Sequence, residues 1–203
     1  MTRMEPIPME EAIAAVPELQ ESLPIFEHDF GFVPNSLRTM ARRPYLVAGF
    51  VALSAAVMGP NGSVPVELKH LISHIASKAA GCRYCQAHTI YVSGRNDIAQ
   101  SRLAALWEYA TSPLFTEAEK AALDFALAAA TVPNGVTDEI FTHLKAYWDE
   151  GEIVEILAVV SMFGFLNRWN DSMATPLEDQ PATKANEILG TQGWEIGKHK
   201  AEE

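Results

Sequence analysis

The chain contains two cysteines, Cys82 and Cys85, which lie in the segment AAGCRYCQAHT (79–89). Cysteines three positions apart in a helix have neighbouring side chains. At the start of a helix, unpaired N–H groups and the CxxC arrangement both lower the pKa of a thiol. A thiolate beside a second thiol can attack a peroxide, form a sulfenic acid and close a disulfide, or exchange with a disulfide substrate. This segment is the first place to look for chemistry.

Acid–base side chains surround the cysteines in the sequence. His88 follows Cys85 by three residues, so in a helix it shares that face and can exchange a proton with a thiol or a leaving group. In the preceding helical segment, four polar side chains fall on one stripe: Glu67, His70, His74 and Lys78. We predict that Cys85, Cys82 and His88 react together, with His70 or Glu67 completing a proton relay.

Other interpretations of the CxxC pair remain open. Two cysteines and two histidines could hold zinc, although three ligands on one straight helix converge poorly on a tetrahedral centre. Buried cysteine is also common as a small apolar core residue. A redox sensor or interaction protein that only records oxidation would carry the same residues as an enzyme.

The composition limits the class of protein. Hydrophobic residues make up 48% of the 203 residues and charged residues 20%, which is enough for a large core. The net charge is −11 and no Lys/Arg cluster is visible, so we expect neither a nucleic-acid partner nor an anionic membrane surface. The N-terminus does not resemble a signal peptide, and the apolar run 156–166 is too short to span a bilayer. We therefore expect a cytoplasmic protein.

Helical periodicity dominates the chain, and alternating strand patterns are nearly absent. We predict a single all-α domain over 1–203, with irregular chain through PIFEHDFGFVPNS and a polar tail after Pro176 that frays or wraps a neighbour. Gly81 should end one helix and Cys82 should begin the next. The predicted helices are 8–15, one starting after Pro34, 45–58, 65–79, one starting near Cys82, 97–110, 116–131, 137–148 and 151–172.

An internal repeat appears when the sequence is shifted by 85 residues. ELKHLISHIASKAAGCRYCQ (67–86) then aligns with EIVEILAVVSMFGFLNRWND (152–171), and CRYC aligns with NRWN. We interpret this as a duplicated helical unit, with a Cys-bearing copy at about 63–110 and a degenerate copy at about 148–178. Asparagines replace the cysteines in the second copy, so it should be inactive in redox chemistry, although Glu155 and Asn170 could line a pocket.

The CxxC segment resembles the alkylhydroperoxidase D / carboxymuconolactone decarboxylase superfamily. Its redox members carry a Glu, eleven residues, CxxC and then a His. The resemblance extends to GFVPNSLRTMARRP (31–44), TEAEKAALDFA (116–126) and the segment 152–171. It implies an alkylhydroperoxidase D-like helical fold with a duplicated unit, homo-oligomers, and thiol-dependent peroxidase or disulfide-reductase activity.

In the family, the second cysteine attacks a hydroperoxide and the first resolves the sulfenic acid, which assigns Cys85 and Cys82 to those roles. The resemblance also implies a dithiol reductant, which in some members is a lipoyl group on a partner protein. We predict neither a cofactor nor a metal. This chain has His70 where the family has its Glu, and Thr89 where the family has its His. A carboxymuconolactone decarboxylase-type lyase is the alternative within the superfamily, but it would leave the dithiol idle.

Overall fold

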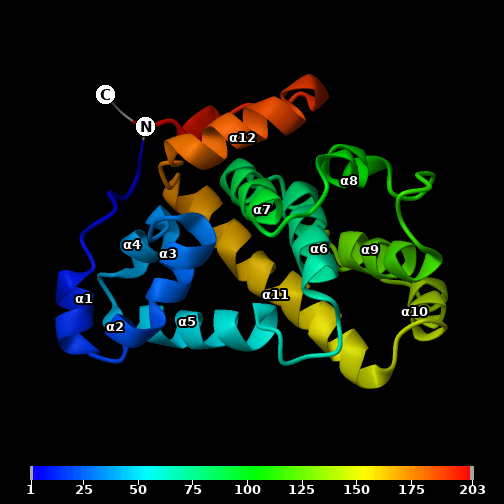
Figure 1. Cartoon of the computed structure of the whole chain (residues 1–203), viewed down its shortest axis with the longest axis horizontal. Helices are drawn as coiled ribbons and strands as arrows, with labels where there is room; N and C mark the ends of the chain where they lie inside the picture. Colours follow the sequence, from blue (N-terminus) through cyan, green and yellow to red (C-terminus); the bar gives the residue numbers. More distant parts are fainter. Residues whose placement is uncertain (1, 202–203) are drawn as a thin grey trace.

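The computed structural model describes residues 2–201, and within them every regular element is helical (Figure 1). This confirms the all-α prediction. The α-helices are α1 (Glu10–Ala15), α2 (Leu19–Ser22), α3 (Pro24–Phe30), α4 (Asn35–Met40), α5 (Pro44–Met58), α6 (Val66–Ala79), α7 (Arg83–Arg95), α8 (Gln100–Ala105), α9 (Glu117–Ala130), α10 (Asp138–Lys145), α11 (Glu150–Met173) and α12 (Asp179–Leu189). Three short 3₁₀ turns follow α8 and α12: η1 (Leu106–Glu108), η2 (Gly190–Gln192) and η3 (Gly197–His199).

The long helix α11 crosses the middle of the molecule, and the other elements pack around it (Figure 1). Helix α6 contacts α7, α9 and α11, so it lies in the centre of the core, and most of its residues are buried. Helix α5 packs against α11, while α12 lies along α7. Among residues 2–201, none of the helices combines the length and the apolar character needed to cross a lipid bilayer.

Local signals explain where the well-predicted helices begin. Thr116 accepts a hydrogen bond from the N–H of Glu119, whose side chain accepts one from the N–H of Thr116, and this capping box starts α9. Asp149 and Glu152 form the same arrangement at the start of α11. Both boxes satisfy backbone N–H groups that would otherwise lack a partner in the first turn.

Two segments differ from the predicted organisation. The stretch expected to be irregular contains α3, because Pro24 suits a first helical turn and Gly31 ends the helix with a left-handed φ of 81°. The tail expected to fray or wrap a neighbour instead forms α12, which packs on α7 of the same chain. Its buried residues are Pro181, Ala185, Ile188 and Leu189, an apolar face that the polar character of the tail concealed.

The two segments of the predicted repeat have different backbones. Residues 67–86 form α6, a turn at Gly81 and the start of α7, whereas residues 152–171 belong to the uninterrupted helix α11. Leu166 stands where Gly81 would align, so nothing breaks the second helix.

Candidate active site at the start of α7

The turn between α6 and α7 creates the arrangement of the two sulfurs. Gly81 has a φ of 73°, and Cys82 follows as the N-cap residue of α7 with extended backbone. The Cys82 Sγ accepts a hydrogen bond from the N–H of Cys85 at 3.3 Å, and the two Sγ atoms lie 2.8 Å apart as free thiols. The structure confirms the prediction that Cys82 begins the helix after Gly81.

Burial dominates the electrostatics of Cys85. Its side chain is 3% exposed and that of Cys82 is fully buried. Burial raises the pKa of the Cys85 thiol well above its ordinary value, and the neighbouring Cys82 sulfur raises it further. Asn170 opposes this by donating from Nδ2 to the Cys85 Sγ at 3.5 Å. The lowered thiol pKa expected from the sequence is not found at Cys85.

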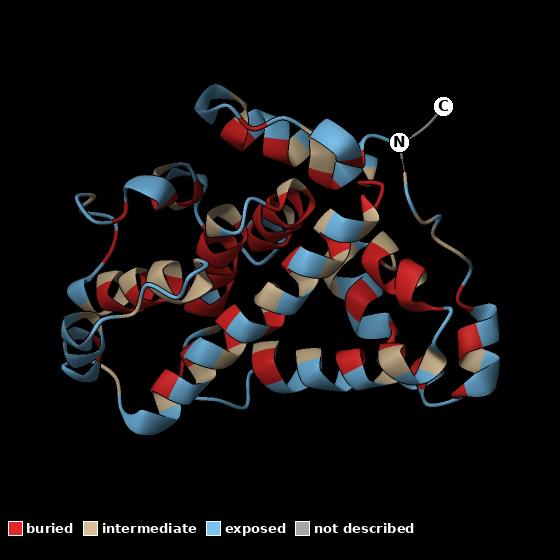
Figure 2. Ribbon diagram, turned by 180° about the vertical axis from the view of Figure 1, so that it is seen from behind, coloured by how far each residue is buried: buried red, intermediate tan, exposed pale blue. Residues whose placement is uncertain are grey.

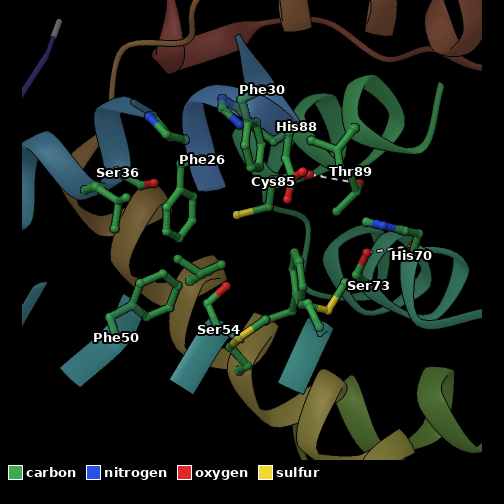
Figure 3. Close-up of a pocket in the computed structure, with 18 of the residues that line it drawn as sticks. Phe26, Phe30, Ser36, Phe50, Ser54, His70, Ser73, Cys85, His88 and Thr89 are labelled. Carbon is green, nitrogen blue, oxygen red and sulfur yellow. Dashed lines mark hydrogen bonds between the residues drawn. The ribbon is translucent and has the colours of Figure 1, made fainter. Parts of the chain in front are cut away.

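Cys85 opens onto a cavity of about 350 Å³. Its sulfur points into this space, toward the ring of Phe26 (Figure 3). Most of the lining is apolar and comes from Ile25, Phe26, Phe30, Leu37, Phe50, Met58, Val66, Met162, Phe163 and Leu166. Its polar groups are fewer and include Ser36, Ser54, His70, Ser73, Tyr84, His88, Thr89 and Asn170. A cavity of this size and character suits a small, largely hydrophobic molecule.

His88 also lines this cavity, and its ring is held by a carboxylate that the sequence analysis did not select. The His88 Nε2 lies 2.6 Å from Glu178 Oε2. Glu178 Oε1 accepts hydrogen bonds from the N–H of Asn35 at 2.6 Å and from the Tyr84 hydroxyl at 3.2 Å. Burial opposes ionisation of Glu178, but His88 and the Asn35 N–H outweigh it and lower the pKa of this carboxyl.

The ionised Glu178 carboxylate can only accept a hydrogen bond, so Nε2 of His88 carries the proton of that contact. The Nδ1 atom then becomes the basic nitrogen of a neutral His88 ring. Aromatic neighbours fix the plane of this ring. Tyr84 stacks on it with ring centroids 4.3 Å apart at 18°, and the Phe30 centroid lies 5.4 Å away.

His70 lies in the cavity wall, and its side chain is 8% exposed (Figure 3). Burial lowers the pKa of His70 to about 4, which keeps the ring neutral at physiological pH. Thr89, which occupies the position of the family's histidine, donates to the carbonyl of Cys85 at 2.9 Å and also contacts His74 Nδ1 at 2.9 Å. The polar stripe of α6 thus reaches the site through His70 and His74.

Glu67 is not brought to the dithiol. It is exposed at the start of α6 and forms an ion pair with Arg102, which also pairs with Glu119. The second segment contributes Asn170 to the cavity, whereas Glu155 lies elsewhere and accepts from the N–H of Ser63 at 2.8 Å. Among residues 2–201, no group of three or more His, Cys, Asp or Glu side chains could hold a metal ion.

With this geometry in view, known proteins define the class. The profile of the Carboxymuconolactone decarboxylase family matches residues 44–128. The debrominase Bmp8 is 34% identical in sequence, and its crystal structure matches 93% of this chain and 98% of its own with a TM-score of 0.83. The chain therefore belongs to the alkylhydroperoxidase D / carboxymuconolactone decarboxylase superfamily, as the CxxC segment indicated.

Particular relatives extend the comparison. Another crystal structure of Bmp8 is of a cysteine-to-alanine variant in complex with 2,3,4-tribromopyrrole. A peroxidase-related protein from Ralstonia eutropha JMP134, described as an alkylhydroperoxidase AhpD core, matches 88% of this chain and 94% of its own with a TM-score of 0.74 and 22% identity, which confirms the alkylhydroperoxidase D-like fold. The Escherichia coli K12 protein YnjA is 28% identical over 152 residues, which are 73% of this chain and 82% of YnjA.

Proposed function

We propose that this protein is a CxxC dithiol oxidoreductase that reduces small hydrophobic organic hydroperoxides. One observation carries the proposal: the Cys85 sulfur faces an apolar cavity, and the Cys82 sulfur lies directly behind it at 2.8 Å. The first atom can meet a substrate and the second can reach the first without a large movement. Membership of a superfamily that includes alkylhydroperoxidase D-like proteins supports the same chemistry.

The reaction follows from these positions. The Cys85 thiolate attacks the terminal peroxide oxygen, the O–O bond breaks, and the alkoxide leaves as an alcohol after it takes one proton. The Cys82 thiol then attacks the Cys85 sulfenic acid, which releases water and closes the disulfide. An external dithiol, free or carried as a lipoyl group on a partner protein, returns both cysteines to thiols through a mixed disulfide.

Proton transfer is the demanding part of this sequence, because burial keeps the Cys85 thiol protonated. His88 lines the same cavity and presents Nδ1 as its basic nitrogen while Glu178 holds Nε2. We assign His88 the transfer of the thiol proton to the leaving alkoxide, and Glu178 the positioning of His88. His70, neutral in the cavity wall, contributes a hydrogen-bonding group rather than a charge.

Reductive dehalogenation of a small aromatic ring is the second candidate. The debrominase Bmp8 is 34% identical over nearly its whole length, and the cavity here is lined with aromatic and aliphatic side chains. In that reaction the dithiol supplies two electrons and is oxidised to the disulfide. The carbon–halogen bond is replaced by a carbon–hydrogen bond, and halide and a proton are released. The same two sulfurs and the same cavity would serve.

Turnover assays with excess dithiothreitol separate these possibilities. We expect many equivalents of cumene hydroperoxide to be consumed per chain, and hydrogen peroxide to be a poorer substrate because it gains nothing from the apolar wall. Brominated pyrroles are tested in the same assay, and the release of bromide measures the dehalogenation activity. Consumption that stops after one equivalent of either substrate would instead identify a sensor. If the Cys85→Ser variant keeps both activities, the assignment of Cys85 to the site is wrong.

We also infer that copies of this chain associate through a face formed by α5 and α11. These helices pack against each other, and both present exposed residues in Figure 2. The exposed apolar side chains on this face are Tyr45, Leu53, Val154, Leu157 and Phe165. Exposed apolar side chains on two helices that pack together favour a contact between copies of the chain. Light scattering should give a mass above 22.2 kDa for the parent, and a lower mass for Leu157→Lys.

A further inference from the structure

A second cavity, of about 300 Å³, lies on the other side of α7 from the dithiol cavity. Residues 84, 85, 88, 89 and 92 line the first cavity, and residues 83 and 86 line the second. At about 100° per residue these two sets lie on opposite faces of the helix. The second cavity also touches Gly81, in the turn that precedes Cys82.

Gln86 is the most informative residue of this cavity. The residue as a whole is 8% exposed, and within residues 2–201 its carboxamide makes no hydrogen bond, but the amide atoms are not sealed from solvent. The Gln86 amide faces the second cavity and, with no partner among residues 2–201, is available to bond a molecule that enters it.

Two cationic side chains, Lys78 and Arg83, also line the second cavity. Lys78 Nζ lies 3.2 Å from Gln192 Oε1 and 4.4 Å from the centre of the Trp107 ring, and within residues 2–201 no carboxylate oxygen lies within 4 Å of it. Gln192 is itself oriented by a hydrogen bond from Nε2 to the carbonyl of Ala104 at 2.9 Å. Arg83 Nη1 donates to the carbonyl of Glu195 at 2.9 Å and lies 3.5 Å from the exposed Glu195 carboxylate, which leaves its other guanidinium nitrogens available to the cavity.

The far wall of the cavity is apolar and is formed by Leu189 and Trp194. In a protein with a net charge of −11, two neighbouring cations beside an unpartnered amide are an unusual concentration of groups that favour an anion. We propose that this second cavity binds a small organic carboxylate, with the carboxylate between Lys78 and Arg83, a hydrogen bond from Gln86, and the apolar body against Trp194.

Fluorine NMR of the full chain labelled with 5-fluorotryptophan tests this without any turnover, so its outcome is independent of the proposed redox activity. The chain has four tryptophans. Trp194 lines the cavity and Trp107 lies under Lys78, while Trp148 and Trp169 contact other regions and serve as internal references. Single Trp→Phe variants assign the four signals.

Benzoate should shift the Trp194 and Trp107 signals saturably, and benzamide, which has the same shape without the charge, should not. Lys78→Met and Gln86→Leu, which lie on different helices, should each weaken benzoate binding at least tenfold. Lys184→Met, a surface change on α12 beside Glu187, should leave it unchanged. Equal shifts with benzamide, saturation by inorganic phosphate at the same concentration as benzoate, or unchanged binding in a folded Lys78→Met or Gln86→Leu protein would overturn the proposal.

Discussion

The segments 67–86 and 152–171 align residue by residue, yet only the first contains a break in the helix. In the first, Gly81 takes a left-handed conformation, which makes Cys82 an N-cap residue whose sulfur accepts the N–H of Cys85. In the second, Leu166 continues the helix, so Asn167 lies in the interior of α11, where its side chain donates to the carbonyl of Ala76 at 3.3 Å. The difference shows that the turn, as much as the side-chain spacing, brings the two sulfurs within 2.8 Å of each other.

The two segments also meet in space, because Asn170 donates to the sulfur of Cys85, its counterpart in the alignment. The second segment therefore acts as a wall of the site built around the first. Changes at matched positions test this division of roles.

The largest effect is expected at this matched pair. Cys85→Ser should lower hydroperoxide turnover by more than about 10³-fold, because a hydroxyl cannot cycle through a disulfide. Asn170→Ala should lower it by about tenfold, since it removes one donor to the thiolate. Peroxide consumption with dithiothreitol measures both. Equal losses in the two variants would contradict the division into a reactive and a supporting segment.

The next largest effect on turnover is expected at Glu178, a carboxylate that lies outside both segments. Glu178→Gln keeps the shape but offers His88 an amide that can donate, which favours the wrong tautomer. We expect kcat for hydroperoxide to fall by about 10²-fold with KM nearly unchanged. Glu67→Gln is the matched control from the first segment, because Glu67 pairs with Arg102 away from the cavity, and it should change kcat less than twofold. A fall in both variants would argue for a general charge effect.

His70 and its counterpart Glu155 should differ in their dependence on pH. Burial lowers the pKa of His70 to about 4, so below about pH 6.5 the unfolded chain takes up a proton that the folded chain does not. The free energy of unfolding should therefore fall as pH decreases from 6.5, by about 2 kcal/mol at pH 5, and this part should be absent in His70→Leu.

Urea unfolding of the parent and His70→Leu at several pH values measures the difference. In Glu155, burial raises the carboxyl pKa, but the N–H groups of Ser63 and Val64 and the side chain of Lys69 outweigh it and leave the pKa lowered. The stability that Glu155 contributes is lost only as pH falls below about 4.5. Above that pH, the free energy of unfolding of Glu155→Gln should therefore change with pH in parallel with that of the parent. A parent-minus-His70→Leu difference that is constant from pH 7 to 5 would show that His70 is not held neutral.

The positions of Cys82, Cys85 and His88 on one helix could be predicted because helical spacing is local. Glu178 could not, because it reaches the site through the packing of α12 on α7, and no periodicity links it to residues so distant in the sequence. Glu67 shares the stripe of His70 on α6, but one turn further from the dithiol it meets Arg102 instead. The raised pKa of the Cys85 thiol could not be predicted either, because it comes from burial and a spacing argument does not include desolvation.

The smallest effect concerns the turn that distinguishes the two segments. An alanine at Gly81 would have open space for its Cβ, but it would have to adopt a φ of 73°. Gly81→Ala should therefore lower the free energy of unfolding by about 1 kcal/mol through backbone strain alone. Gly94→Ala, in the helical part of α7, should raise it by about 0.5 kcal/mol, because alanine favours the helix.

Urea unfolding of both variants at neutral pH gives the comparison, and opposite signs are the expected outcome. If Gly81→Ala is as stable as Gly94→Ala, the left-handed conformation is not what separates α6 from α7, and the break must come from residues further along the turn. If the signs are opposite and Gly81→Ala keeps its turnover, the packing of α6 against α7 holds residue 81 in the left-handed conformation even when alanine disfavours it. Leu166, the aligned residue in the second segment, meets no such demand because it lies within the regular helix α11.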